Sequence, residues 1–339
     1  MVTDSKSFKV GFFAPSSRVS WIELQEGLAE LEKRGFDCVV HPQVKKTHLF
    51  FAGTDQERAE AFWKMARDPE LRVMWAARGG YGSARLLSIL ERFTREQGAP
   101  PSGKLYVGYS DSTALQEFVR KRWGWFGLHG EMPGLRKFTE RKPAELKALC
   151  EWVRGGGGGW PELAARTLGR KGLKLLTAGG RSGVAEGEVV GGNLTVVCSL
   201  LGTPYAVDFS NRIAFLEDTD EPLYRIDRTV QQLLNSGALK GARAVVLGNF
   251  AHCRDVVPLT AARIGGPKKT PLRKELSAVP TLQAMFKRLG DESGVPVFWG
   301  LPVGHGDQHF ALPLGQGVSA AIEIAAGARF EMRSWGWQG

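Results

Sequence analysis

Short apolar runs alternate with segments of helical periodicity through residues 8–154 of the chain. Two of these runs, Leu71–Ala77 and Lys104–Gly108, are short and mostly apolar, as buried strands are. Strands that alternate with helices along a chain are typical of βαβ units, in which helices cover a parallel sheet. This part of the chain therefore predicts an α/β domain with a parallel sheet.

Helix-start signals support this interpretation. Ser20 with Glu23 and Thr54 with Glu57 have the spacing of capping boxes, in which each partner satisfies a free backbone N–H of the first turn. The predicted strands are 8–14, 38–40, 71–77 and 104–108, and the predicted helices begin near Ser20, Thr54, Ser83, Ser112 and Pro143.

A run of five glycines, 155–159, opens a polar stretch without periodicity. It divides the chain into a domain over 1–154, a linker over 155–182 and a strand-rich mixed domain over 183–339. In this last part we expect strands near 183–190, 212–216, 242–247 and 318–324, and a helix near 223–235. Residues 254–280 are basic and contain proline and glycine, so they predict a lid-like loop.

Composition excludes several classes of protein. No window holds the apolar run that a membrane span needs, and the first residues lead into a strand rather than a signal sequence, so we expect a cytoplasmic protein without membrane contact. The four cysteines lie far apart, which argues against zinc or disulfide frameworks. The net charge of +10 is scattered and not interleaved with aromatic residues, so we expect no nucleic-acid partner.

Ser110 lies where a buried strand turns into a helix, a geometry that presents a nucleophile at the carboxyl edge of a sheet. The helix N-terminus there offers backbone N–H groups to an oxyanion. The alternative is that Ser110 or Asp111 only caps the next helix. The hydrolase elbow G-x-S-x-G is not met, because Ser112 takes the place of its second glycine.

The segment Arg78–Gly82 also follows a strand and opens a helix, so its amides face the same edge. It matches neither a dinucleotide fingerprint nor a Walker loop. Backbone N–H groups of Gly80 and Asp111 could together form an oxyanion hole.

An acidic run that includes Glu217 and Asp218 follows a strand of the second half, although most such runs are simply solvated. His305 lies between two glycines and could act as a general base or be a structural loop residue. His305 and His309 have metal-ligand spacing only if they are helical, which the surrounding glycines oppose. His129 could line a binding pocket, or it could be a turn residue whose ring is hydrogen-bonded within the fold. A serine, an acid and a histidine are the parts of a catalytic triad, and their spacing leaves open whether they meet.

Eight motifs in order resemble the LD-carboxypeptidases of bacterial cell-wall recycling, a serine peptidase family that also includes the microcin C immunity peptidases. The motifs are Ala52–Arg58, Arg78–Gly82, Gly108–Asp111, His129–Gly130, Gly191–Leu194, Leu216–Asp218, Tyr224–Arg228 and Gly304–His305. The resemblance runs from Gly11 to Gly315, almost the whole chain.

The resemblance implies that Ser110 is the nucleophile, His305 its base and Glu217 the orienting acid, with oxyanion donors from Gly80 and Asp111. It also implies a flavodoxin-like N-terminal domain that carries the serine, a strand-rich C-terminal domain that carries the acid and base, and a homodimer. No metal or cofactor is implied.

The implied reaction removes the terminal D-alanine of a murein tetrapeptide from the L-centre of meso-diaminopimelate or lysine. Expected substrate-binding residues are Arg78, Tyr81, His129 and Arg225, and either arginine could bind the terminal carboxylate. Glu131 stands where the family usually has proline, and the segment 254–280 is long. These departures leave open an aminoacyl-nucleotide antibiotic conjugate as the alternative substrate, and a non-catalytic two-lobed binding protein is the third hypothesis.

Overall fold

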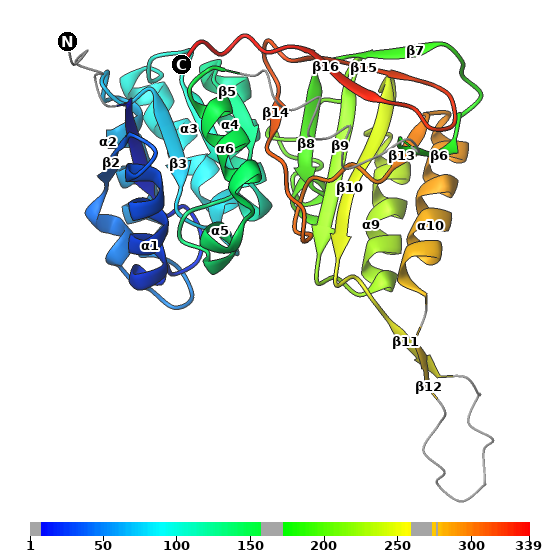
Figure 1. Ribbon diagram of the computed structural model, residues 1–339, viewed down its shortest axis with the longest axis horizontal. Coiled ribbons are helices and arrows are strands. Elements are labelled where there is room, and N and C mark those ends of the chain that lie inside the picture. The colour runs from blue at the N-terminus through cyan, green and yellow to red at the C-terminus, as the bar shows by residue number, and fades with distance from the viewer. Residues whose placement is uncertain (1–7, 157–171, 259–272, 276) are drawn as a thin grey trace, which may run out of the picture.

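The computed structural model describes residues 8–156, 172–258, 273–275 and 277–339, which form two lobes that lie side by side (Figure 1). The N-terminal lobe is built on a six-stranded sheet and the C-terminal lobe on a five-stranded sheet. Smaller sheets of three and two strands complete the C-terminal lobe. Among the helices of these residues, none has the length and apolar character of a membrane-spanning segment.

Five parallel strands form most of the N-terminal sheet, in the order β5-β4-β3-β1-β2. Their bounds are Phe8–Phe13 (β1), Phe36–Val40 (β2), Val73–Ala76 (β3), Leu105–Gly108 (β4) and Phe126–His129 (β5). This is the strand order of flavodoxin-like folds, which confirms the expected fold class. In such a sheet, ligands bind at the carboxyl ends of the strands.

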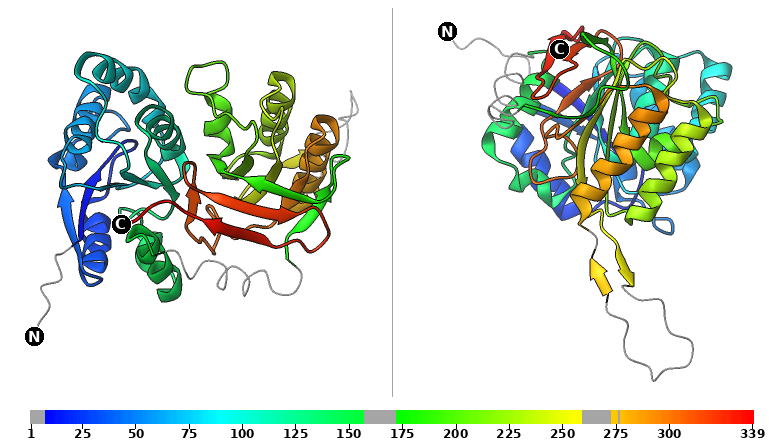
Figure 2. Two further views of the ribbon diagram at one scale, coloured as in Figure 1. Left: turned by 90° about the horizontal axis from the view of Figure 1, so that it is seen from above. Right: turned by 90° about the vertical axis from the view of Figure 1, so that its right-hand side faces the viewer.

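Helices cover both faces of this sheet (Figure 2). Helices α1, α5 and α6 pack on one face and α2, α3 and α4 on the other. Phe12 and Phe13 show why, because successive strand side chains point to opposite faces and these two enter different core clusters. The bounds are Trp21–Glu32 (α1), Asp55–Ala66 (α2), Leu87–Gln97 (α3), Thr113–Trp123 (α4), Arg136–Glu140 (α5) and Pro143–Val153 (α6).

The predicted helix starts are present at both capping sites. Thr54 and Glu57 form a complete capping box at the start of α2. Ser20 accepts a hydrogen bond from the backbone N–H of Glu23 at the start of α1. Short 3-10 turns at Pro42–Lys45, Ser83–Leu86 and Ser110–Ser112 complete the N-terminal lobe.

The C-terminal sheet has the order β6-β13-β10-β9-β8, with only β6 antiparallel to its neighbour. Its bounds are Lys174–Thr177 (β6), Val189–Asn193 (β8), Ile213–Thr219 (β9), Ala244–Ala251 (β10) and Val297–Trp299 (β13). Helices α8, α9 and α10 lie on one side of it, and strands β7, β15 and β16 lie on the other (Figure 2). Their bounds are Leu194–Ser199 (α8), Leu223–Ser236 (α9), Ala278–Ser293 (α10), Val184–Gly187 (β7), Ser319–Glu323 (β15) and Phe330–Ser334 (β16).

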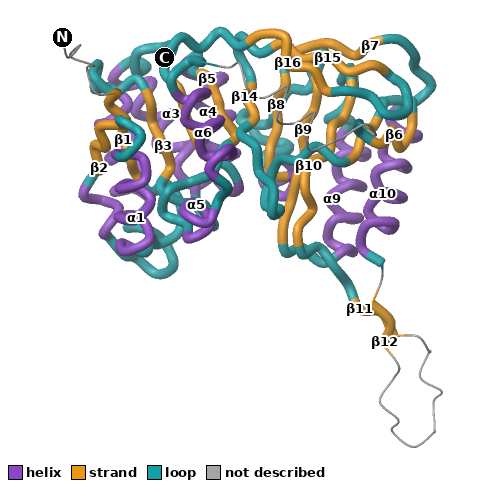
Figure 3. The backbone as a smooth tube through the Cα atoms, in the orientation of Figure 1, coloured by secondary structure: helices purple, strands orange, loops and turns teal. Residues whose placement is uncertain are grey.

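Two expectations about connecting segments are corrected. The predicted loop over 254–280 contains Val256–Pro258 (β11) and Arg273–Glu275 (β12), which pair as an antiparallel hairpin that projects from the C-terminal lobe (Figure 3). The β-branched residues of β11 favour this extended backbone. Within the predicted linker 155–182, residues 174–177 form β6 and join the C-terminal sheet. Residues 157–171 and 259–272 lie outside the described part of the chain, and the domain boundaries remain predictions.

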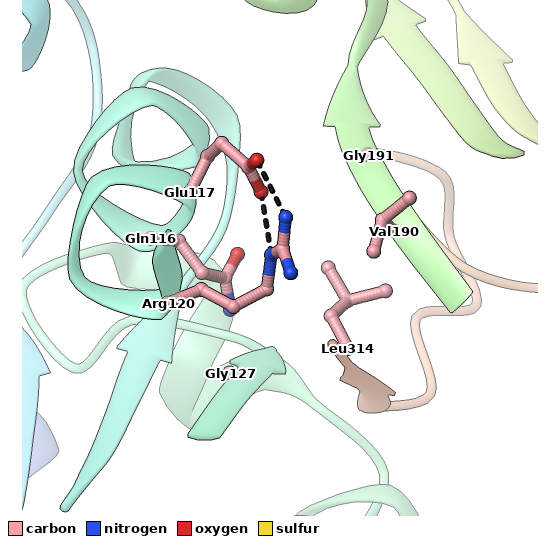
Figure 4. A pocket seen from close by; sticks show the side chains of 7 residues that line it. All are labelled: Gln116, Glu117, Arg120, Gly127, Val190, Gly191 and Leu314. Atoms are coloured by element: carbon pink, nitrogen blue, oxygen red, sulfur yellow. Dashed lines mark hydrogen bonds and ion pairs between the residues drawn. The ribbon is translucent and has the colours of Figure 1, made fainter. Parts of the chain in front are cut away.

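The two lobes are joined by more than one passage of the chain. Strand β14 (Leu312–Leu314) comes from the C-terminal half but pairs antiparallel with β5 at the edge of the N-terminal sheet. The backbone N–H of Asn193 donates to the Thr113 hydroxyl on α4 at 3.1 Å. A small pocket at this junction is lined by Gln116, Glu117, Arg120, Gly127, Val190, Gly191 and Leu314, and Glu117 pairs with Arg120 beside it (Figure 4).

Candidate active site

Ser110 follows β4 at the carboxyl edge of the N-terminal sheet and opens the 3-10 turn before α4. Its backbone has φ 63°, a left-handed conformation that costs a non-glycine residue about 1–3 kcal/mol. The chain at Gly79 approaches it closely, because a Cβ on Gly79 would lie 3.0 Å from the Ser110 Cβ and 3.1 Å from its Oγ. Ser110 is therefore held in a strained turn against the glycine loop that follows β3.

Neither Ser110 nor Asp111 serves as a helix cap, because the caps of the 3-10 turn and of α4 are Tyr109 and Ser112, without side-chain bonds. Instead, the buried Asp111 carboxylate accepts hydrogen bonds from the Ser16 hydroxyl at 2.5 Å and the Ser83 backbone N–H at 2.7 Å. The amides of Gly80 and Asp111 make no hydrogen bond within the described residues. The Asp111 amide directly follows Ser110, and the Gly80 amide follows Gly79, whose backbone lies against Ser110.

The C-terminal lobe contributes a buried carboxylate that is bonded to a histidine. Glu217, on β9, is fully buried, and its Oε2 lies 2.7 Å from Nδ1 of His305. The backbone N–H of His305 donates to the same oxygen at 3.3 Å. Gly304 makes this approach possible, because its φ is +109° and a Cβ there would lie 2.5 Å from the Glu217 Oε2. The acid, the glycine and the histidine therefore form one unit of the C-terminal lobe.

The charges of this pair shift both pKa values. Burial lowers the pKa of His305, but the charge and hydrogen bond of Glu217 outweigh it, and the net pKa lies above the ordinary 6.5. Burial raises the pKa of Glu217, but the charge and hydrogen bonds of His305 hold the net pKa below 4.5. Glu217 is thus an anion at neutral pH, placed to stabilise a protonated His305.

The carboxylate of Asp218, the next residue in the chain, does not contact His305 and binds other groups. It accepts bonds from the Asn193 amide at 2.9 Å and from the Thr195 backbone and hydroxyl at 3.0 and 2.8 Å. Successive residues of a strand point to opposite sides, which explains why only one of the two acids meets His305. Burial and the nearby charge of Glu217 raise the pKa of Asp218 to about 6.

Tyr109 brings the two lobes together at the site. Its buried ring lies 4.6 Å from the His305 ring and 4.7 Å from the His309 ring, measured between centroids. Because Tyr109 directly precedes Ser110, the serine turn and the His305 loop are neighbours across the lobe junction. No hydrogen bond joins Ser110 to His305 within the described residues, and such bonds are often long in enzymes without substrate.

The four expected substrate-binding residues come from three parts of the chain: the loop after β3, the end of β5, and α9. His129 is fully buried, and its Nε2 lies 3.9 Å from the Glu217 Oε1, an oxygen that has no hydrogen-bond partner in the described part of the chain. Arg78 precedes the glycine loop and donates to the Arg18 carbonyl at 2.9 Å. Tyr81 is half exposed and packs on Phe51. Arg225 is exposed on α9 and contacts Glu221 and Tyr224.

Several residues that hold the site together were not predicted from the sequence. Arg58 is buried, donates to the carbonyls of Pro15 and Gly82 and pairs with Asp55, so it fixes the loop that carries Gly80. The sequence marks Arg58 only as the last residue of the motif Ala52–Arg58. Arg141 and Glu131 form a buried pair beside the His305 loop. Glu131 was noticed only as a departure from the family pattern, and no sequence signal marks Arg141.

Metal chemistry receives no support from the side chains near His305. In the part of the chain that the structure describes, no group of three or more His, Cys, Asp or Glu residues could hold a metal ion. His309 Nδ1 accepts a hydrogen bond from the Gly304 backbone N–H at 2.9 Å. His305 and His309 therefore shape one loop rather than forming an i, i+4 ligand pair on a helix.

Comparison with known proteins identifies the family. Models of the LD-carboxypeptidase N-terminal and C-terminal domains match residues 10–130 and 186–319. The murein tetrapeptide carboxypeptidase of Pseudomonas aeruginosa is 30% identical over 314 residues, which cover 91% of this chain and 91% of that protein. The chain belongs to the LD-carboxypeptidase family. It is thus a serine carboxypeptidase, and the resemblance inferred from its motifs is confirmed.

Two further proteins show the breadth of this LD-carboxypeptidase family. The crystal structure of a muramoyltetrapeptide carboxypeptidase from Oxalobacter formigenes is 27% identical, with a TM-score of 0.72, and the match covers 98% of this chain and 100% of that one. The microcin C7 self-immunity protein of Escherichia coli is 26% identical over 340 residues, or 93% of this chain and 90% of that protein. The shared fold thus serves relatives with two different names and tasks.

Proposed function

We propose that the protein removes the terminal D-alanine from murein tetrapeptides by hydrolysing its amide bond to the L-centre of meso-diaminopimelate or lysine, in peptidoglycan recycling. One observation carries the proposal: the buried Glu217 binds His305 Nδ1 at 2.7 Å beside the strained turn of Ser110. This arrangement leaves Nε2 as the ring nitrogen free to exchange a proton with the serine. The name of the Pseudomonas aeruginosa relative supports the choice of substrate.

In the proposed mechanism, Ser110 Oγ attacks the scissile carbonyl carbon while His305 Nε2 takes its proton. Glu217 holds the opposite ring N–H and stabilises the imidazolium. The amides of Gly80 and Asp111 donate to the oxyanion. Asp111 directly follows Ser110, Gly80 follows Gly79, which lies against Ser110, and no partner of either amide is found among the described residues. His305 then gives its proton to the departing D-alanine amine. A water molecule, activated by His305, releases the tripeptide from Ser110.

A carboxypeptidase must also bind the free terminal carboxylate, for which the fork of an arginine is well suited. Arg78 is better placed than Arg225, because it directly precedes Gly79, which lies against Ser110. The buried Arg78 Nε has no hydrogen-bond partner within the described residues. We therefore assign the carboxylate to Arg78. We also propose that the protein acts in cell-wall recycling in the cytoplasm and that it forms a homodimer.

One observation favours a second substrate class. Phe50 and Tyr81 are about half exposed, and their rings lie 5.9 Å apart beside the loop of Gly80. Exposed aromatic rings stack well on nucleobases. An aminoacyl-nucleotide antibiotic conjugate, the substrate that the motif resemblance to the microcin C immunity peptidases leaves open, is therefore the alternative.

The test is mass spectrometry of a murein tetrapeptide incubated with the wild-type protein and with Ser110→Ala, with EDTA in both samples. We expect the wild type alone to release one D-alanine, and Ser110→Ala to lose about 10⁶-fold in kcat. Intact tetrapeptide in both samples, with cleavage of an aminoacyl-nucleotide conjugate by the wild type, would replace the murein substrate by the alternative. Equal cleavage by Ser110→Ala would disprove the role of the serine.

A further inference from the structure

A buried ion pair lies beside the loop that carries His305. Arg141, directly after α5, has a side chain only 6% exposed, and its Nε and Nη2 lie 2.8 and 2.7 Å from Oε2 of Glu131. Glu131 itself is 2% exposed. Both residues belong to the N-terminal lobe, which also carries Ser110. A buried arginine is costly unless it is paired. Glu131 supplies the close partner of Arg141, and a second buried carboxylate, Glu145, lies 3.8 Å from its Nη1.

The third nitrogen of the Arg141 guanidinium reaches the other lobe. Its Nη1 donates to the carbonyl oxygens of Gly306 at 3.2 Å and Asp307 at 2.9 Å, the two residues that follow His305. One planar side chain thus connects a carboxylate of the serine lobe to two consecutive peptide groups of the histidine loop. A lysine ammonium has no such planar fork, so it would not reproduce the paired bonds to Glu131 together with those to the two carbonyl groups.

From the N-terminal lobe, the His305 loop is also contacted by Lys137, whose Nζ donates to the His305 carbonyl at 3.4 Å, and by the Tyr109 ring, which lies 4.6 Å from the His305 ring. On its own side the loop is held by Asn249, whose Nδ2 donates to the Gln308 carbonyl at 2.8 Å, and by the bond from Gly304 to His309. These last two contacts, like the Glu217 bond to His305, lie within the C-terminal lobe. They fix the ring relative to Glu217, whereas Ser110 lies in the other lobe.

We propose that Arg141, held by Glu131, is a positioning residue that sets the placement of His305 against Ser110 across the lobe junction. The inference rests on the catalytic roles proposed above. It explains why a glutamate can stand at position 131: the carboxylate orients the guanidinium, and the guanidinium orients the loop. Arg141 acts through the backbone of residues 306 and 307 and does not touch the substrate.

The test compares Arg141→Ala and Arg141→Lys with Arg136→Ala as the matched control. Arg136 is the first residue of α5, the helix that Arg141 directly follows. It pairs with Glu140 and has a side chain 79% exposed, so its loss leaves the loop contacts intact. The first measurement is the rate at which a fluorophosphonate probe modifies Ser110, because this reaction needs the serine and its base but no peptide substrate. The second is kcat and KM on the tetrapeptide.

We expect Arg141→Ala to be labelled about 10²-fold more slowly than the wild type, as for a misplaced catalytic group, with KM changed less than about threefold. The labelling rate of Arg141→Lys should lie between those of the wild type and Arg141→Ala, and the rate of Arg136→Ala should match that of the wild type. Guanidinium ion added to Arg141→Ala should restore part of the labelling rate, which a general loss of stability would not show. If Arg141→Ala does not fold, Arg141→Lys decides the question.

Labelling of Arg141→Ala or Arg141→Lys at the wild-type rate would overturn the inference. A slow rate in Arg141→Ala that guanidinium leaves unchanged would also overturn it. These results are distinct from failure of the proposed function. A wild type that is labelled at Ser110 but leaves the tetrapeptide intact has a different substrate, and the positioning role is then judged by the labelling rates alone.

Discussion

Three histidines surround Tyr109, and burial affects them differently. Burial lowers the pKa of His129 to about 4 and holds that of His309 well below 6.5. Both rings are therefore neutral at physiological pH. His305 differs because Glu217 lies 2.7 Å from its Nδ1 and more than offsets the burial, so its net pKa is raised. Of the three, only His305 is suited to accept and return a proton near neutral pH.

This difference predicts the pH dependence of activity. The proposed base is the neutral ring of His305, whose raised pKa means that the neutral form is lost as the pH falls through a value above 6.5. Glu131 and Asp218 add smaller contributions in the same direction. Glu217→Gln removes the main negative charge, so the acid limb of the kcat/KM profile should move to lower pH. We also expect kcat to fall by about 10⁴-fold, as when the acid of a Ser-His-Asp triad becomes an amide.

The control for this profile is Glu140→Gln, which removes an exposed carboxylate of the N-terminal lobe. Its acid limb should coincide with that of the wild type. An acid limb of Glu217→Gln that stays in place or moves to higher pH would contradict the assignment of Glu217 as the group that raises the pKa of His305.

At the scale of elements, the loop that carries His305 depends on glycines for two separate reasons. Gly300 and Gly304 have φ +104° and +109°, a backbone region unfavourable for other residues. A Cβ on Gly300 would meet nothing within 4 Å, whereas a Cβ on Gly304 would meet the Glu217 carboxylate at 2.5 Å. A substitution at Gly300 therefore introduces backbone strain alone, whereas one at Gly304 adds a direct collision with the Glu217 carboxylate.

Gly304→Ala and Gly300→Ala form a matched pair of variants. Both should lose about 1–3 kcal/mol of stability through backbone strain. Only Gly304→Ala should also lose activity, by about 10²-fold in kcat, because its methyl group displaces Glu217 from His305. Urea denaturation and steady-state kinetics on the folded proteins measure the two effects. Equal losses of kcat in both variants would show that the loop backbone, and not the contact with Glu217, is the sensitive feature.

Elements with strong local signals could be predicted from the sequence. Thr54 and Glu57 have the spacing of a capping box before an apolar pattern, which favours a helix start, and the structure has that helix at Asp55–Ala66. The buried run before Ser110 likewise appears as the strand Leu105–Gly108. Such signals are local, so neighbouring residues alone determine them.

Elements that depend on distant partners could not be predicted. Leu312–Leu314 is three residues long and contains proline, and only pairing with β5 makes it a strand. The same holds within the site. From the residues alone the choice between Glu217 and Asp218 stays open, and only the family resemblance favours Glu217; in the structure it follows from which face of β9 meets His305. The role of Arg141 follows from carbonyl groups more than a hundred residues away in the chain. The residue types were visible, but their partners were set by tertiary packing.

At the scale of the whole molecule, one apolar core runs through both lobes. The same cluster contains Val107 and Leu128 of the N-terminal sheet and Val189 and Phe215 of the C-terminal sheet. The segment after β16 also returns to the N-terminal lobe, where Trp337 is buried against Phe126 and donates to the Val153 carbonyl at 2.9 Å. The lobes are thus packed together at the amino ends of the N-terminal strands as well as at the site.

Trp337 should therefore matter for stability and not for chemistry. Trp337→Ala is expected to lower the free energy of unfolding by about 3–5 kcal/mol, the usual cost of removing a large buried ring. The kcat/KM of the folded protein should stay within about twofold, because Trp337 contacts the first residue of β5 while Ser110 lies at the carboxyl edge. Urea denaturation and kinetics at 25 °C measure both. Trp337→Phe, which keeps a ring, should lose less stability, and a large drop in kcat/KM would refute this separation.

The antiparallel pairing of β14 with β5 has a consequence for how the protein is made. A ribosome synthesises the serine lobe first, yet the last strand of its sheet and the proposed base, His305, emerge only much later. The growing chain therefore carries a nucleophile without its proton acceptor, and its N-terminal sheet has an open edge. On the proposed assignment, peptide hydrolysis begins only after the second lobe has folded, so the order of synthesis itself keeps unfinished chains inactive.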